Sequence, residues 1–132
     1  MTTFAVQMIS VTIDAPFDRA YAFASQPGNF AQWASGLADT LHESDSGWVA
    51  ATPQGEAIVE FSDPNGYGVL DHRVLLPGQP PIAIPLRMVP NGDGTELTLT
   101  LFRLPEMDDA AFDRDAATVR ADLARLKALL EA

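Results

Sequence analysis

The stretch DDAAFDRDAATVRADLARLKALLE at 108–131 decides the fold class of this 132-residue chain. Asp108 can cap its first turn, and its basic residues gather in the second half, as a helix dipole favours. At 1.5 Å per residue this helix would be about 36 Å long. That exceeds twice the radius of gyration for such a chain, ~28 Å. The helix is therefore predicted to cross the whole domain. Its apolar residues recur every three or four positions and form one stripe: Phe112, Ala116, Val119, Leu123, Leu126 and Leu130.

The N-terminal part predicts one strand and two short helices. Apolar and polar residues alternate over 5–13, which is the period of a half-buried strand. Pro16 suits the first turn of a helix over 17–25. Pro27 ends that helix and opens a second one over 27–34.

Short apolar stretches follow residue 36, and each is closed by residues typical of turns. The short gaps between them indicate hairpins, so an antiparallel meander is predicted. Pro85 lies inside one stretch and cannot donate to a ladder, so that strand is expected to be bulged or at an edge. The stretches span 38–43, 48–52, 56–62, 69–76, 82–89 and 95–103.

This order predicts a single α+β domain over residues 1–132. We expect a curved antiparallel sheet of about seven strands wrapped around the long C-terminal helix, with two short helices after the first strand. A sheet with one apolar face curls around the single helix that covers it. The space between sheet and helix is then the interior available for a ligand.

Several strings resemble the helix-grip superfamily (SRPBCC), which includes START domains, plant pollen-allergen proteins and bacterial polyketide cyclases. VTIDAPFDRAYAF at 11–23 is similar to the family's first strand and helix, and NFAQW at 29–33 to its second helix. GVLDHR at 68–73 and the tail from 101 to 127 resemble a bacterial branch. The resemblance covers essentially the whole chain and implies the helix-grip fold. Its members bind lipids, sterols and hormones, cyclise polyketides or assist chaperones, so the fold implies no single function.

His72 is a candidate for chemistry because it shares a strand face with apolar neighbours. In 69–76, Leu70, His72 and Val74 alternate with polar residues, so His72 is expected to point inward. A histidine in a cavity can act as a general base or bind a ligand, because its pKa lies near neutrality. The simpler interpretation is a core histidine bonded to a neighbouring backbone group.

Two arginines are candidates for an electrophilic role. By parity, Arg103 points the same way as the leucines of its strand, whereas the irregularity at Pro85 leaves the direction of Arg87 open. An inward arginine would hold a ligand carboxylate or stabilise an enolate. The simpler interpretation is an ion pair with an acidic neighbour: Glu60, Glu96 or Asp71.

Aromatic and apolar side chains of the sheet and helices are expected to line the cavity. Trp33 is the strongest candidate, because the second short helix lies at the cavity mouth in the proteins that the chain resembles. Core packing is the simpler explanation for the aromatic residues. The full set of expected ligand-binding residues is Trp33, Phe30, Trp48, Phe61, Leu70, Met88, Leu99 and Val119.

Composition narrows the classes of protein and site that are still possible. The chain has no cysteine, which excludes disulfides, zinc–thiolate sites and a cysteine nucleophile. Its net charge of −10 would repel nucleic acids and anionic membranes. No apolar run approaches the ~18 residues of a membrane span, and the start lacks the basic residues of a signal peptide. We expect a cytoplasmic protein with no metal, cofactor, nucleic-acid partner or membrane insertion.

Three functions follow from these expectations. The leading one is binding of a small hydrophobic or amphipathic ligand between the sheet and the C-terminal helix. The alternative, implied by the resemblance to polyketide cyclases, is a cofactor-free cyclase or dehydratase with His72 as general base and Arg103 or Arg87 at the enolate. The third is a protein-interaction module that uses the acidic convex face. The sequence leaves both a monomer and a homodimer possible, since nothing in it selects an interface.

Overall fold

The computed structural model describes residues 2–35 and 40–132. Strand β1 (Val6–Ile13) leads into α1 (Phe17–Ala24) and the 3₁₀ helix η1 (Pro27–Gln32), and α2 (Asp109–Glu131) ends the fold. The described residues thus form an α+β domain with eight strands, against the seven or so expected. The other strands are β2 (His42–Ser44), β3 (Gly47–Thr52), β4 (Gly55–Phe61), β5 (His72–Leu75), β6 (Ile82–Ile84), β7 (Leu86–Asn91) and β8 (Gly94–Phe102).

Two expected elements are shorter than predicted. The second helix, expected over 27–34, is a six-residue 3₁₀ helix, a common form for a short connector. The strand expected over 38–43 begins only at His42, and residues 38 and 39 lie outside the described residues. The stretch expected as one strand over 82–89 is divided into β6 and β7.

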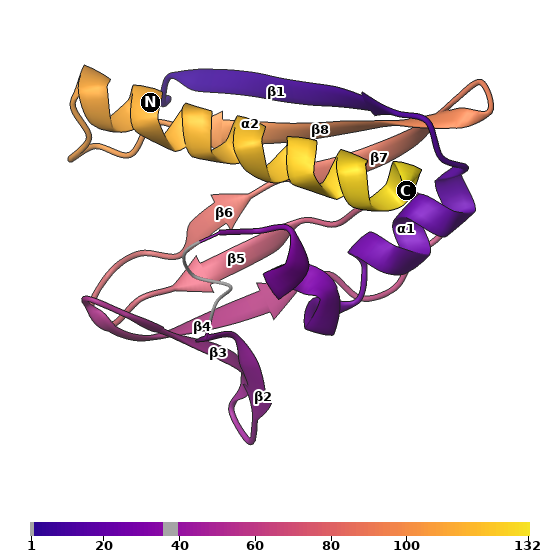
Figure 1. Ribbon diagram of the computed structural model, residues 1–132. Helices are drawn as coiled ribbons and strands as arrows, with labels where there is room; N and C mark the ends of the chain where they lie inside the picture. The colour runs from indigo at the N-terminus through magenta and orange to yellow at the C-terminus, as the bar shows by residue number, and fades with distance from the viewer. Residues whose placement is uncertain (1, 36–39) are drawn as a thin grey trace.

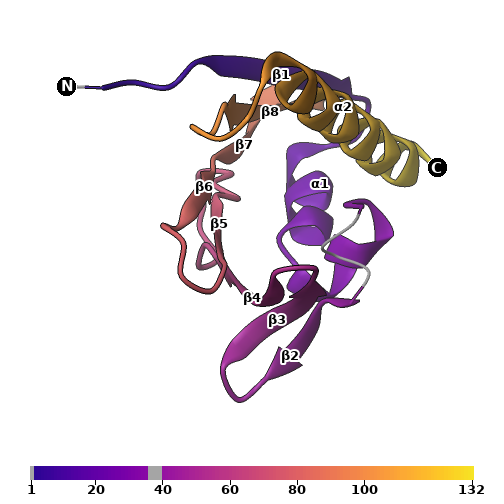
Figure 2. The same ribbon diagram turned by 90° about the vertical axis from the view of Figure 1, so that its left-hand side faces the viewer.

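The strands form two antiparallel parts, with the order β1-β8-β7 in one and β2-β3-β4-β5-β6 in the other. Strand β1 pairs with β8 along its whole length, from Val6 opposite Phe102 to Ile13 opposite Thr95. Figure 2 shows the strands curling into a C, with the helices on its open side. The curved sheet and the long C-terminal helix are those of the helix-grip arrangement.

Pro85 marks the division between the two parts of the sheet, since it lies between β6 and β7. Proline has no N–H to donate, so the ladder breaks there and the sheet bends. Two backbone hydrogen bonds connect the segment before β5 to β7 and so hold the two parts together. Leu70 N donates to Leu86 O at 2.8 Å, and Met88 N donates to Gly68 O at 2.9 Å. The irregularity predicted at Pro85 is confirmed as a break inside the curved sheet.

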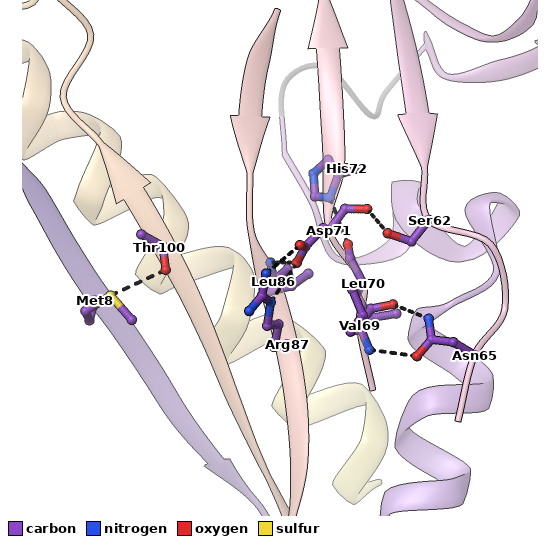
Figure 3. Close-up of polar contacts among 10 residues, drawn as sticks. All are labelled: Met8, Ser62, Asn65, Val69, Leu70, Asp71, His72, Leu86, Arg87 and Thr100. Atoms are coloured by element: carbon purple, nitrogen blue, oxygen red, sulfur yellow. Dashed lines mark hydrogen bonds and ion pairs between the residues drawn. The ribbon is translucent and has the colours of Figure 1, made fainter. Parts of the chain in front are cut away.

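Gly68 makes this close junction possible. Its φ of 74° is left-handed, which glycine adopts without strain, and a Cβ at this position would overlap the carbonyl oxygen of Met88. Asn65 holds the same segment from the other side. Its amide oxygen accepts from Val69 N at 3.1 Å and its amide nitrogen donates to Val69 O at 2.9 Å (Figure 3).

Helix α2 lies across the concave side of the sheet, along β1 and β8 (Figure 1). The predicted cap is confirmed, because the Asp108 carboxylate accepts from Ala111 N at 2.8 Å. Burial of each leucine in the stripe contributes roughly 1.5–3 kcal/mol. Val119 alone in the predicted stripe is half-buried. The buried members are Phe112, Ala116, Leu123, Leu126 and Leu130.

Polar contacts fix the C-terminal end of α2 to the start of the chain. Arg19 donates to Leu130 O at 2.6 Å, and Lys127 donates to Thr12 O at 2.7 Å. The backbone N–H of Asp14 donates to the Glu131 carboxylate at 2.7 Å. These contacts set the position of the helix over the sheet and therefore the space beneath it.

We predict that Leu126→Ala destabilises the protein by about 2–5 kcal/mol, because the leucine is fully buried and its removal leaves a cavity. The matched control is Leu129→Ala on the same turn, where the leucine is 38% exposed. Its free energy of unfolding should change by less than about 1 kcal/mol. Urea titrations followed by circular dichroism measure both, and equal losses would contradict the packing described for α2.

Candidate functional site

A cavity of about 270 Å³ lies between α2, η1 and the sheet. Its sheet side is apolar and comes from β5, β6 and β8, chiefly Val74, Ile82, Ile84, Leu99 and Leu101. Its α2 side carries polar groups at helical spacing, namely Asp115, Thr118 and Asp122, with Val119 between them. Val119 is half-buried because it borders this space. The cavity therefore has one apolar wall and one acidic, polar wall.

Phe30, Trp33 and His72 close the cavity toward η1. The Phe30 ring meets Trp33 edge-on at a centroid distance of 5.0 Å and His72 at 5.4 Å. Trp33 is only 4% exposed. Its indole Nε1 is buried and has no hydrogen-bond partner among the described residues. A buried donor without a partner is costly, so this N–H stands out among the polar groups of the described residues.

His72 points inward as predicted, and it is 6% exposed. Its Nδ1 lies 3.2 Å from Leu70 O. A carbonyl oxygen only accepts, so Nδ1 carries the hydrogen and Nε2 remains a base and acceptor. Burial lowers the pKa of His72, although the Leu70 carbonyl and the Asp71 carboxylate oppose that shift. The backbone contact expected from the simpler interpretation is thus present, in a histidine that also borders the cavity.

The two acidic residues of the α2 wall have different surroundings. Asp122 accepts from Ser35 N and from Arg125, both at 3.2 Å, so part of its charge is compensated. Asp115 is half-buried, and burial alone raises the pKa of its carboxyl group. Sequence reasoning overlooked both residues. Their spacing of seven, with Thr118 and Val119 between them, is the signal that could have placed them on the same face as the apolar stripe.

Arg103, which was expected to point inward with the leucines of its strand, is not among the described residues that border the cavity. β8 ends at Phe102, and the Arg103 guanidinium turns to the loop before α2. It donates to Met107 O at 3.0 and 3.1 Å and pairs with Asp109 at 2.5 Å. Its backbone N–H still donates to Ala5 O at 2.9 Å, so pairing with the first strand continues past Phe102 while Met107 and Asp109 hold the side chain.

Arg87 lies on the outer face of the sheet. It pairs with Asp71 at 2.9 Å, and Asp71 also accepts from Leu86 N at 2.9 Å (Figure 3). This is the ion pair that the simpler interpretation anticipated. Arg73 and Glu60 pair beside it. Neither Arg87 nor Arg103 is among the described residues that line the cavity.

Four of the eight expected ligand-binding residues border the cavity: Phe30, Trp33, Leu99 and Val119. Phe61 and Leu70 instead border a hollow of about 20 Å³ behind Phe30. Met88 is fully buried in the core. Trp48 packs edge-on against Phe61 at a centroid distance of 6.3 Å, outside the cavity. Curvature decides these positions, because it separates the residues of one sheet face.

Comparisons with known proteins show the fold. No protein-family model matches the chain, and none of the curated proteins matches it. XoxI from Bacillus cereus is 14% identical, with a TM-score of 0.72 over 96% of this chain and 95% of XoxI. Ara h 8.0201 is 9% identical, with a TM-score of 0.61 over 97% of this chain and 98% of that one.

A further similar structure belongs to DynU16, a protein in the dynemicin biosynthetic locus. It is 17% identical with a TM-score of 0.68, and the match covers 96% of this chain but 47% of DynU16. This chain thus spans about half the length of DynU16. The expected resemblance to the helix-grip superfamily is confirmed at the level of fold: this chain has the helix-grip fold.

Two further observations concern other kinds of site. In residues 2–35 and 40–132, no helix combines the length and apolar character needed to cross a membrane. Within the same ranges, no three histidine, aspartate or glutamate side chains lie together as ligands for a metal ion.

We predict that His72 makes the protein less stable in mild acid. Its folded pKa is lowered below the ordinary 6.5, so the unfolded chain takes up a proton first as the pH falls. The free energy of unfolding should therefore start to decrease near pH 6.5 and continue to decrease down to the folded pKa. Urea titrations across this range should show a weaker pH dependence for His72→Gln than for the wild type. A variant at the exposed His42, His42→Gln, is the control, and an unchanged pH dependence in His72→Gln would refute the assignment.

Proposed function

We propose that the protein binds a small hydrophobic or amphipathic molecule in the cavity between the sheet and α2. The observation that supports this most is the cavity itself, with a volume of about 270 Å³, an apolar wall on the sheet side and polar groups on the α2 side. Binding sites for small molecules have this composition, and the cavity lies just below their usual volumes of about 300 to 1,000 Å³. Trp33 Nε1–H and His72 Nε2 supply one donor and one acceptor for orientation.

A second hollow adjoins the cavity and extends the space for a ligand. It has a volume of about 370 Å³ and shares Ile82, Ala83, Phe102 and Leu104 with the cavity. Pro80, Pro81 and Pro105 form much of its outer wall. A ligand longer than the inner cavity would extend out of it between β6 and the end of β8, with its tail against these prolines.

We predict that Val119→Trp abolishes binding of the uncharged apolar dye Nile red, because the indole would fill the space in front of Val119. Ala121→Trp is the control, since Ala121 is exposed on the same helix. Dye fluorescence measures both variants, and circular dichroism establishes that they are folded. Equal dye binding by Val119→Trp and the wild type would place the ligand elsewhere.

A complementary experiment is native mass spectrometry of freshly purified protein, followed by solvent extraction of anything that co-purifies. A reproducible small molecule would support the proposal and define its class. The same spectrum gives the oligomeric state, which is still open. A cytoplasmic location also stays a prediction from the sequence.

The second proposal, a cofactor-free cyclase or dehydratase, is favoured by the neutral base His72 Nε2 at the cavity. Arginine would not stabilise an enolate here, since both arginines lie elsewhere. Donors on the residues that line the cavity include the Ser35, Thr100 and Thr118 hydroxyls as well as Trp33 Nε1–H. His72→Ala separates chemistry from binding: lost turnover of a polyketide-type thioester with Nile red binding retained supports an enzyme. An interaction module ranks third, because the outer charges pair with each other, as Glu60 does with Arg73.

A further inference from the structure

The charged side chains that border the cavity are acidic, and this observation extends the proposed function. Among the described lining residues the charged ones are Asp115 and Asp122, without a lysine or arginine. Burial lowers the pKa of His72, which favours its uncharged form. An anionic ligand would therefore lose its hydration without gaining a charge partner, which is unfavourable.

Asp115 is the acidic residue whose surroundings call for a cation. It is half-buried on α2, and its pKa is raised by burial with no opposing hydrogen bond or positive neighbour in the part of the chain described. Asp122 already receives hydrogen bonds from Ser35 and Arg125. A positively charged group from a ligand would compensate the Asp115 charge in a site partly removed from water.

The geometry of the walls describes the rest of the ligand. Asp115 and Asp122 are seven residues apart on one face of α2, about 10 Å along the helix. The opposite wall, which includes Ile84, Leu99 and Leu101, is apolar. An apolar body against the sheet would leave a polar group facing α2.

We propose that the cavity selects a cationic amphiphile, an amine with a compact apolar body whose ammonium group binds the Asp115 carboxylate. This inference rests on the proposed ligand-binding function. It differs from the possibility considered from the sequence, in which an inward arginine would hold a ligand carboxylate.

The test must separate Asp115 from the overall charge of −10, which attracts any cation. Asp113 provides the matched control: it lies on the same helix, is exposed and does not border the cavity. Asp115→Asn and Asp113→Asn each remove one negative charge. Circular dichroism and urea titration establish that both variants fold.

Isothermal titration calorimetry with naphthylethylamine, naphthylethanol and naphthylacetate compares one apolar body with three head groups. We expect the amine to bind the wild type about tenfold more tightly than the carboxylate. Asp115→Asn should weaken amine binding roughly five- to tenfold and leave the alcohol nearly unchanged. Asp113→Asn should behave like the wild type.

The outcomes distinguish this inference from the proposed function. Carboxylate binding as tight as amine binding, or equal losses in Asp115→Asn and Asp113→Asn, would overturn the inference while the cavity remains a ligand site. Nile red binding without amine binding would also overturn the inference and leave the cavity as a ligand site. If neither the naphthyl compounds nor Nile red binds, the proposed function itself fails.

Discussion

The leucine stripe of α2 packs on β1 and β8, while the sheet beyond Pro85 curves away from the helix. The stripe is buried at Leu123, Leu126 and Leu130, where helix and sheet are in contact. At Val119 the same stripe borders open space. One straight helix cannot cover both parts of a sheet that bends this strongly, and the uncovered part is the cavity. The position of the site thus depends on this packing and on the break at Pro85.

The second constraint is the cost of buried polar groups without partners. Trp33 Nε1 and the Asp115 carboxylate are both removed from water, wholly or in part, without a partner in the described residues. A core selected for stability alone would replace or pair such groups. Trp33 and Asp115 both border the cavity, which supports the proposal that a ligand supplies the missing hydrogen bond and charge.

Periodicity predicted the parts of the structure that depend on regular backbone. The helix over 108–131, its cap at Asp108 and the inward direction of His72 follow from spacings of 3.6 and two residues. The break at Pro85 follows from a missing N–H. These features are local, so a single sequence contains them. The helix-grip arrangement also followed from the order of elements and from family resemblance.

Which residues form the site could not be predicted in full, because it depends on features that are not local in the sequence. Arg103 is held by the Met107 carbonyl and by Asp109, which follow its strand in the loop and at the start of α2. Met88 and Leu99 are both buried, yet only Leu99 borders the cavity, because Met88 pairs with Leu97 at a different point along the two strands. Asp115 was overlooked because an acidic residue near the start of a helix already has a sufficient explanation in the helix dipole.

The indole N–H signals of the two tryptophans, Trp33 and Trp48, test the central claim most directly. A ¹H–¹⁵N correlation spectrum resolves them. The signal that disappears in Trp33→Phe belongs to Trp33, and the other belongs to Trp48. During titration with an apolar molecule that carries an acceptor oxygen, such as naphthylethanol, the Trp33 indole proton should shift downfield as it gains a hydrogen bond. The Trp48 signal should stay in place. A bound ligand that moves only Trp48, or neither signal, would contradict a site between α2, η1 and the sheet.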